Sequence, residues 1–172
     1  APVADPGPVR RVPGATPAAR VEPKARRRSP IWPALFVAAV AVAIVFAWNI
    51  QCALTFLLFP ENAVGAYELN GVAGEAAVQG IAVAFLMWNA TYPLVIFDPN
   101  RHRTVFGIVL AQQLIGLLGE SWILLTIQRG HDILAASISR FILFDAIGLI
   151  IMAGAFVALM IAEKNSIKTH GC

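Results

Sequence analysis

The stretch LLGESWILLTIQRGHDILAASISRF, Leu117–Phe141, contains two apolar runs joined by the short polar turn QRGHD. Each run carries one ionisable side chain, Glu120 in the first and Arg140 in the second. Both lie ten residues from Gly130, on opposite sides of the turn. In a tight helical hairpin such residues lie at the same level, so we predict a Glu120–Arg140 ion pair between the helices. The alternative for Arg140 is to extend its guanidinium towards the headgroups at the end of the helix.

The composition places this hairpin in a membrane. The chain is 58% hydrophobic and 13% charged, whereas a soluble domain carries about 25% charged residues. A helix needs about 20 apolar residues to cross a bilayer. Four segments meet this requirement, at about 31–59, 72–97, 104–127 and 133–162. The predicted fold is therefore all-α, a polytopic membrane protein with four antiparallel transmembrane helices in a bundle. Pro93 should kink the second span near one end.

The two ends of the chain differ from these spans. Residues 1–30 are rich in Pro, Ala and Arg, and seven of the thirteen Lys and Arg residues lie in the first 28. Such a segment buries too little apolar surface to fold alone, so we expect an extended cytoplasmic tail that contacts a partner. Residues 163–172 are predicted to be a cytoplasmic C-terminal stub. Because the excess of positive charge belongs to the tail, no nucleic-acid-binding surface is predicted.

The basic residues also predict the orientation. Arg101 and Arg103 lie in the second loop, and Lys164 and Lys168 lie in the C-terminal segment. The first loop, in contrast, has Glu61 and Glu68 and no basic residue. Basic residues favour the cytoplasmic side of a membrane. We therefore expect an integral protein of the cytoplasmic (plasma) membrane, with both termini in the cytoplasm.

Polar side chains inside the spans are the candidate functional residues, because ionisable groups in a membrane usually face the bundle interior. Asp145 lies about 140° around its helix from Arg140, at 100° per residue, so the two side chains cannot easily face the same neighbouring helix. Asp145 must find another donor, such as Gln112, Gln113 or Asn49, or remain protonated. A protonated Asp145 would suit a proton relay or a quinone contact, whereas a hydrogen-bonded one would be structural. The candidate ion pair or polar cluster comprises Glu120, Arg140, Asp145, Asn49, Gln51 and Gln79.

A second polar set lies near the inner turn. Asn89 and Gln112 are almost equally far from Asn100, so an amide–amide hydrogen bond across the second and third spans is expected, with Gln113 as a second candidate. Such bonds hold membrane helices together. The polar residues of the outer half could line a small cavity, or they could form one satisfied network that closes the bundle.

The sequence lacks the usual signatures of catalysis. The three histidines, His102, His131 and His170, fall outside the predicted spans, which excludes a haem or chlorophyll held by histidine within the membrane. There is no nucleotide-binding, hydrolase or metalloprotease motif, and the two cysteines have no metal-type spacing. No catalytic residue, metal site or cofactor is therefore predicted, and quinone or lipid is left open as a ligand.

Two stretches carry a resemblance to a known family. FPENAVGAYELNGVAGEAAVQGIAVAFLMWNATYPLVI, Phe59–Ile96, resembles the first loop and second span of DoxX-like small four-helix membrane proteins, and SRFILFDAIGLIIMAGA, Ser139–Ala155, is similar to their last helix. The resemblance implies a four-helix membrane bundle, attached in some members to quinone-linked oxidoreductases. The chain departs from the pattern in its basic tail and in the opening of its first span.

Three functions follow as hypotheses. The first is a non-catalytic accessory subunit of a larger membrane complex of respiratory or photosynthetic type, with the lipid bilayer and other subunits as partners. The second is a DoxX-like quinone- or redox-linked protein that uses Glu120, Arg140 and Asp145 around a pocket. The third is a small transporter or proton pathway that uses the same residues.

Overall fold

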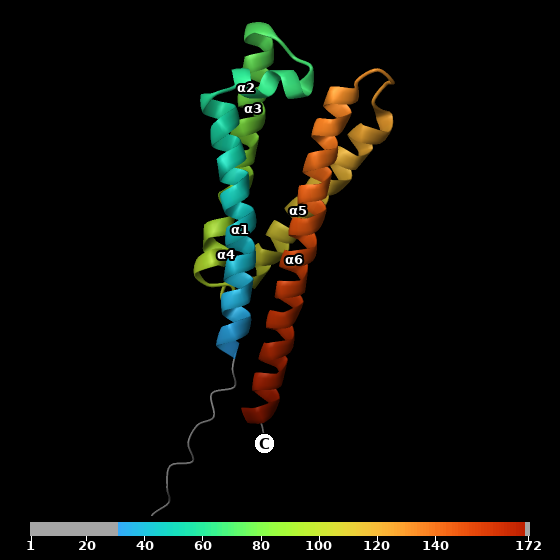
Figure 1. The fold of residues 1–172 in the computed structure, drawn as a ribbon. Helices are drawn as coiled ribbons and strands as arrows, with labels where there is room; N and C mark the ends of the chain where they lie inside the picture. The colour runs from blue at the N-terminus through green and yellow to red at the C-terminus, as the bar shows by residue number, and fades with distance from the viewer. Residues whose placement is uncertain (1–30, 171–172) are drawn as a thin grey trace, which may run out of the picture.

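Every regular element that the structure describes is a helix (Figure 1). The computed structural model describes the backbone of residues 31–170 and the side chains of residues 31–167. The predicted tail, residues 1–30, lies outside this range, as do Cys172 and the side chain of Lys168. The elements are α1 (Ile31–Leu58), α2 (Glu61–Val64), the 3-10 helix η1 (Gly65–Tyr67), α3 (Gly71–Asn89), α4 (Tyr92–Phe97), α5 (Arg103–Thr126) and α6 (Asp132–His170).

Four stretches of helix are long and apolar enough to cross a membrane, as predicted. They are Ile31–Leu58, Gly71–Phe97, Arg103–Thr126 and Asp132–Ile167. No more than 22% of the most apolar window of any of them is buried inside the protein. Most of their large apolar side chains therefore face outwards, which suits hydrocarbon and not water as the surrounding solvent. The chain is accordingly a membrane protein.

The central pair of helices is α1 and α6. The helix α3 packs along α1, and α5 packs along α6 (Figure 1). The short helix α4 contacts both α1 and α5, so it connects the two pairs beside the first half of α1 (Figure 1). The helix η1 contacts α6 near the opposite end of α1. These two short elements hold the pairs together at two different levels of the molecule.

The second span is interrupted close to Pro93, as predicted. The helix α3 ends at Asn89, which is four residues before the proline, and α4 begins at Tyr92. A proline ring clashes with the carbonyl group four residues earlier and provides no N–H for it, so Asn89 is where the helix has to break. The hydroxyl of Thr91 donates a hydrogen bond to the Trp88 carbonyl oxygen, 3.3 Å away, and satisfies one group exposed by the break.

Two separate apolar clusters form the interior. The larger one contains Val42, Val45, Tyr92, Phe106, Met152 and Leu159, among others. The smaller one contains Phe56, Ala63, Val78 and Ala82. Along both α1 and α6, the residues between the two clusters include polar side chains, Asn49 on α1 and Asp145 on α6. The polar groups thus occupy the middle of the molecule.

The last helix is longer than the sequence predicted. It continues to His170, past the predicted boundary at residue 162, so the stub begins as a continuation of the helix. The sequence from Ala162 to His170 contains no glycine or proline that would stop a helix. The guanidinium of Arg103, at the start of α5, donates two hydrogen bonds to the Glu163 carboxylate and joins the two helices there.

At the opposite end, Glu68 connects the first loop to the last one. Its carboxylate bonds to His131 Nδ1 and accepts a hydrogen bond of 3.2 Å from the Leu134 N–H in the first turn of α6. Glu68 has a left-handed backbone with a φ of 55°. The hydrogen bond from His131, followed by that from Leu134, holds the pKa of Glu68 below its ordinary value.

We expect Glu68→Gln to lower the unfolding temperature of the purified protein at pH 7, because the charged hydrogen bonds are lost. A carboxylate whose pKa is lowered by folding stabilises the protein above its unfolded pKa, near 4.5, and loses this effect as the pH falls through the folded value. The difference from wild type should therefore shrink as the pH falls below the unfolded pKa and vanish once Glu68 is protonated in both states. Glu61→Gln, in the same loop, is the control. A difference that persists at low pH would contradict this account.

Candidate functional site

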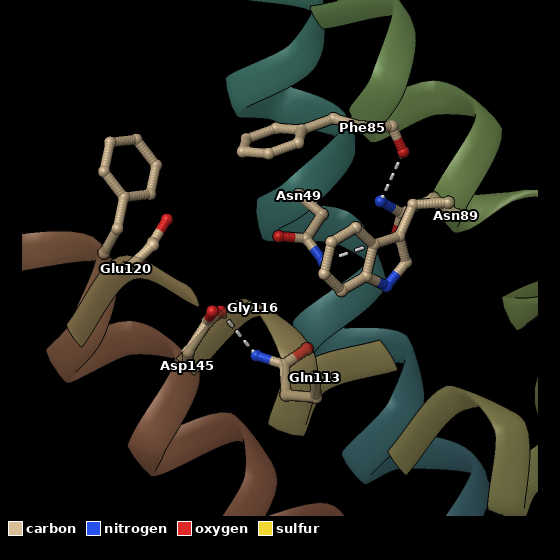
Figure 2. A pocket seen from close by; sticks show the side chains of 9 residues that line it. Asn49, Phe85, Asn89, Gln113, Gly116, Glu120 and Asp145 are labelled. Atoms are coloured by element: carbon tan, nitrogen blue, oxygen red, sulfur yellow. Dashed lines mark hydrogen bonds between the residues drawn. The ribbon is translucent and has the colours of Figure 1, made fainter. Parts of the chain in front are cut away.

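A small cavity lies between the two apolar clusters and is lined by several polar residues of the spans (Figure 2). Its volume is about 40 Å³. All four membrane helices contribute to its lining, which consists of Asn49, Phe85, Trp88, Asn89, Gln113, Gly116, Glu120, Phe141 and Asp145. The residues of α5 and α6 that carry the carboxyl groups lie on one side, and Asn49 and Asn89 lie on the other (Figure 2).

On the first side, Gln113 holds Asp145. The amide of Gln113 donates a hydrogen bond of 2.7 Å to Asp145 Oδ1, and its oxygen accepts one of 3.2 Å from the Tyr92 hydroxyl. Gln113 and Tyr92 are fully buried. One of the three donors that the sequence proposed for Asp145 is therefore the observed one. This chain of bonds joins α4, α5 and α6.

On the second side, two asparagines meet. Asn49 Nδ2 donates to Asn89 Oδ1 at 3.3 Å, and Asn89 Nδ2 donates to the Phe85 carbonyl oxygen at 2.8 Å (Figure 2). The predicted amide–amide bond of Asn89 thus exists, but it joins α3 to α1. The predicted bond between Asn89 and Gln112 is not formed, since Gln112 accepts instead from the Thr91 hydroxyl at 3.2 Å. The helix break before Pro93 brings Thr91 and Tyr92 opposite the two glutamines.

Glu120 is the unsatisfied member of the cavity. Its Oε2 atom is buried and has no hydrogen-bond partner among the described residues, and the same is true of Trp88 Nε1. An unpaired buried polar atom is costly, so each one calls for a partner such as water. A cavity needs roughly 10–15 Å³ to hold a water molecule, and this one exceeds that. The site can therefore hold water that bonds to the Glu120 carboxyl group.

The structure does not form the predicted Glu120–Arg140 ion pair. Within the range whose side chains the structure describes, the ion pairs join Arg103 to Glu163 and Glu68 to His131. The helix period gives the reason. Asp145 faces α5, where Gln113 binds it, and Arg140 lies about 140° around α6 from Asp145. Equal depth put Glu120 and Arg140 at one level but could not make them face each other.

Three other predicted residues also lie outside the cavity. Arg140 is exposed, and its Nε donates a long bond of 3.4 Å to the Ala136 carbonyl oxygen. Gln51 is exposed on α1. Gln79 is exposed as well and donates to the Leu57 carbonyl oxygen at 3.2 Å, which ties α3 to the end of α1. Of the predicted cluster, the structure brings together Glu120, Asp145 and Asn49, and adds Asn89 and Gln113.

Sequence reasoning missed the residues that shape the cavity. A Cβ atom on Gly116 would lie 2.5 Å from Asp145 Oδ2 and 3.0 Å from the Trp88 ring, so only glycine leaves room for this carboxyl group. Phe85 and Phe141 close the cavity as part of the lining. The signal that could have found Gly116 is its four-residue spacing from Glu120 on one face of α5.

The chemistry of the lining is acidic and amide-rich. Among the described residues, no group of three or more histidine, cysteine, aspartate or glutamate side chains could hold a metal ion. The lining contains no lysine, arginine or histidine. What the arrangement offers is two carboxyl groups, three amides and space for water, which together can hold and pass a proton.

Comparison with known proteins does not identify this site. No protein-family model matches the sequence, and no curated protein or solved structure matches it either. The resemblance to DoxX-like proteins therefore stays a prediction, and the site must be interpreted from its own chemistry.

We expect Gly116→Ala to destabilise the protein by about 1–3 kcal/mol, the usual cost of overfilling a packed interior. The new methyl group would displace the Asp145 carboxyl and break its bond to Gln113. Gly119→Ala, on the same helix, is the matched control, because its Cβ would meet nothing within 4 Å. Unfolding in mixed detergent micelles would measure both variants, and equal stability of the two would contradict the assigned role of Gly116.

Proposed function

We propose that this membrane protein is a proton pathway that binds and exchanges a proton at Glu120 and Asp145 within the bilayer. The observation that carries the proposal is the presence of two carboxyl groups in one cavity whose lining has no basic residue. Ionisable residues inside a membrane are rare, and they mark ion pathways and proton relays.

Electrostatics supports a bound proton. Two like charges in a water-poor site repel strongly, so one of two neighbouring carboxyl groups is favoured to hold a proton. Gln113 stabilises the Asp145 side of the pair by hydrogen bonding. Glu120, whose Oε2 atom has no protein partner, is the group free to exchange its proton with water in the cavity. The two carboxyl groups therefore have different roles, Asp145 held in place and Glu120 available.

The size of the cavity supports a proton over a larger substrate. Pockets for small organic ligands usually have about 300–1,000 Å³. The observed volume of about 40 Å³ suits a few water molecules and is too small for a quinone ring. Among the three functions considered from the sequence, the proton pathway fits this geometry best.

We expect the wild-type protein in sealed vesicles to speed proton uptake driven by a valinomycin-clamped potassium gradient, as reported by an internal pH-sensitive dye. Glu120→Gln and Asp145→Asn should each slow this uptake by about tenfold or more, because proton relay by a positioned group contributes a factor of about 10²–10⁴. Both substitutions keep the shape of the side chain. Glu75→Gln is the control, since Glu75 is a half-buried carboxyl of α3 outside the cavity.

A wild-type rate equal to that of empty vesicles would contradict the proposal. Equal rates for Glu120→Gln, Asp145→Asn and Glu75→Gln would also contradict it, because the cavity would then have no part in the flux.

We further propose that the four spans form an antiparallel bundle in the cytoplasmic membrane with both termini in the cytoplasm. The support is the distribution of charge. Arg101, Arg103 and Lys164 flank the spans at one end, and the first loop, at the other end, has Glu61 and Glu68 without a basic residue. Positive charge is retained on the cytoplasmic side.

Labelling of single cysteines tests this orientation. After Cys52 and Cys172 are replaced by serine, a membrane-impermeant maleimide should label Asn62→Cys in intact cells. The same reagent should label Arg101→Cys only after lysis, because the second loop faces the cytoplasm. The reverse pattern would overturn the proposed orientation.

Two other functions remain predictions. An accessory role in a larger complex rests on the tail, residues 1–30, and on small residues along the spans, such as Gly80 and Ala84 on α3. A DoxX-like quinone link rests on the resemblance of Phe59–Ile96 and Ser139–Ala155 to that family. Co-purification in a mild detergent would test the first, and quinone-dependent electron transfer would test the second.

A further inference from the structure

A second, larger cavity lies on the other side of Phe141. It is a groove of about 280 Å³ between α1 and α6, beneath α2 and η1. Phe141 lines both cavities and so stands between them. It makes ring contacts with Phe56, Tyr67 and Phe85, with centroids 6.2–6.5 Å apart, which forms an aromatic wall. Glu120 and Asp145 line only the first cavity, and Arg140 lines only the groove.

Three polar side chains of the groove lack a partner for their donors. Arg140 uses only its Nε, in a long bond to its own helix, and forms no ion pair with any residue whose side chain is described. Ser137 is 4% exposed, and its hydroxyl makes no hydrogen bond within the described range. The amide of Asn62 is likewise unbonded to the residues that the structure describes. All three line the same groove and can donate hydrogen bonds.

Arg140 lies well inside the span, so its guanidinium costs free energy there unless a ligand or water pairs with it. Arg140 lies eight residues after Asp132, the first residue of α6, so it is about 12 Å along the helix. A guanidinium at that depth needs an anion or water, because hydrocarbon offers it no partner. No acidic group among the described side chains forms an ion pair with Arg140. Glu68 bonds to His131, and Glu120 lines the other cavity.

The remaining lining is apolar and aromatic. Trp48 and Phe56 of α1 face the groove together with Cys52. Trp48 is 59% exposed and stacks on Phe144 of α6 with ring centroids 5.6 Å apart. The groove thus combines a cationic, donor-rich part with an apolar part that is open to the surrounding bilayer. A snorkelling arginine alone explains neither the free Ser137 hydroxyl nor this aromatic surface.

We propose that this groove binds an anionic amphiphile of the membrane, with its carboxylate or phosphate headgroup on Arg140. Guanidinium groups pair with such anions through two parallel hydrogen bonds. Ser137 and Asn62 donate to the remaining headgroup oxygens, and the acyl chain lies against Trp48 and Phe56. The site is separate from the proton pathway and does not depend on it.

Tryptophan quenching tests the proposal on the full chain in micelles of a neutral detergent. Brominated acyl chains quench nearby tryptophans, so a brominated fatty acid and a brominated phosphatidylglycerol are compared with a brominated fatty alcohol and phosphatidylcholine. The anionic compounds should quench saturably and at lower concentration than the other two. Trp48→Phe should remove the saturable part, which shows that the signal comes from the groove.

Substitutions then locate the headgroup. Arg140→Gln should weaken binding of the anionic compound by about tenfold to a hundredfold, the usual worth of a hydrogen bond to a charged group. Arg140→Lys should retain part of the affinity, and Ser137→Leu should block the groove with the arginine intact. Arg129→Gln, an exposed loop arginine outside the groove, is the matched control and should bind as wild type.

The outcomes separate the two sources and the alternatives. Saturable quenching by the fatty acid alone assigns a free carboxylate, and quenching by phosphatidylglycerol alone assigns a phospholipid. Equal quenching by the alcohol and phosphatidylcholine would overturn the proposal, as would wild-type affinity in Arg140→Gln and Ser137→Leu. Circular dichroism of each variant shows that the helices are intact, and Arg140→Lys and Ser137→Leu provide the answer if Arg140→Gln does not fold.

Discussion

The absence of water from the hydrocarbon layer is the constraint on which this structure depends. Backbone groups meet it by forming helices, and polar side chains meet it by bonding to one another. Gln113 shows the consequence most clearly. It is fully buried, yet its amide serves two partners at once, the Tyr92 hydroxyl and the Asp145 carboxyl. Without Gln113, two buried oxygen atoms on two different helices would lose their partner.

The same constraint explains why small residues surround this network. A Cβ atom on Gly148 of α6 would lie 3.1 Å from Gln113 Nε2 and 3.3 Å from a Val45 methyl group. Gly116 similarly leaves the space that Asp145 occupies. The two glycines allow α5 and α6 to approach closely while amide and carboxyl groups still fit between them. Polar bonding and close helix packing are therefore achieved at the same positions.

The sequence predicted features that depend only on position along the chain. It missed features that depend on which face of a helix a residue occupies. Hydropathy predicted most of the span ends to within one or two residues, because a bilayer requires a fixed length of apolar helix. The C-terminal end of the last span is the exception. Pro93 marked the break because its effect on the preceding turn is local. The Glu120–Arg140 pair failed because equal depth says nothing of which face a residue occupies. The 140° between Arg140 and Asp145 meant that only one could face α5, and the sequence did not say which.

Contacts between loops, such as Glu68 with His131, could not be predicted either, because they depend on how the two helix pairs are placed. The same placement decides the character of both cavities. If Arg140 had faced α5, its charge would have neutralised Glu120 and left neither an unpaired acid nor an unpaired cation. Instead, Glu120 lines one cavity and Arg140 lines the other, with Phe141 in both linings. An unpaired ionisable group in a medium of low dielectric constant has a strong demand for a partner. That demand is the basis of the two proposed ligands, a proton for one cavity and an anion for the other.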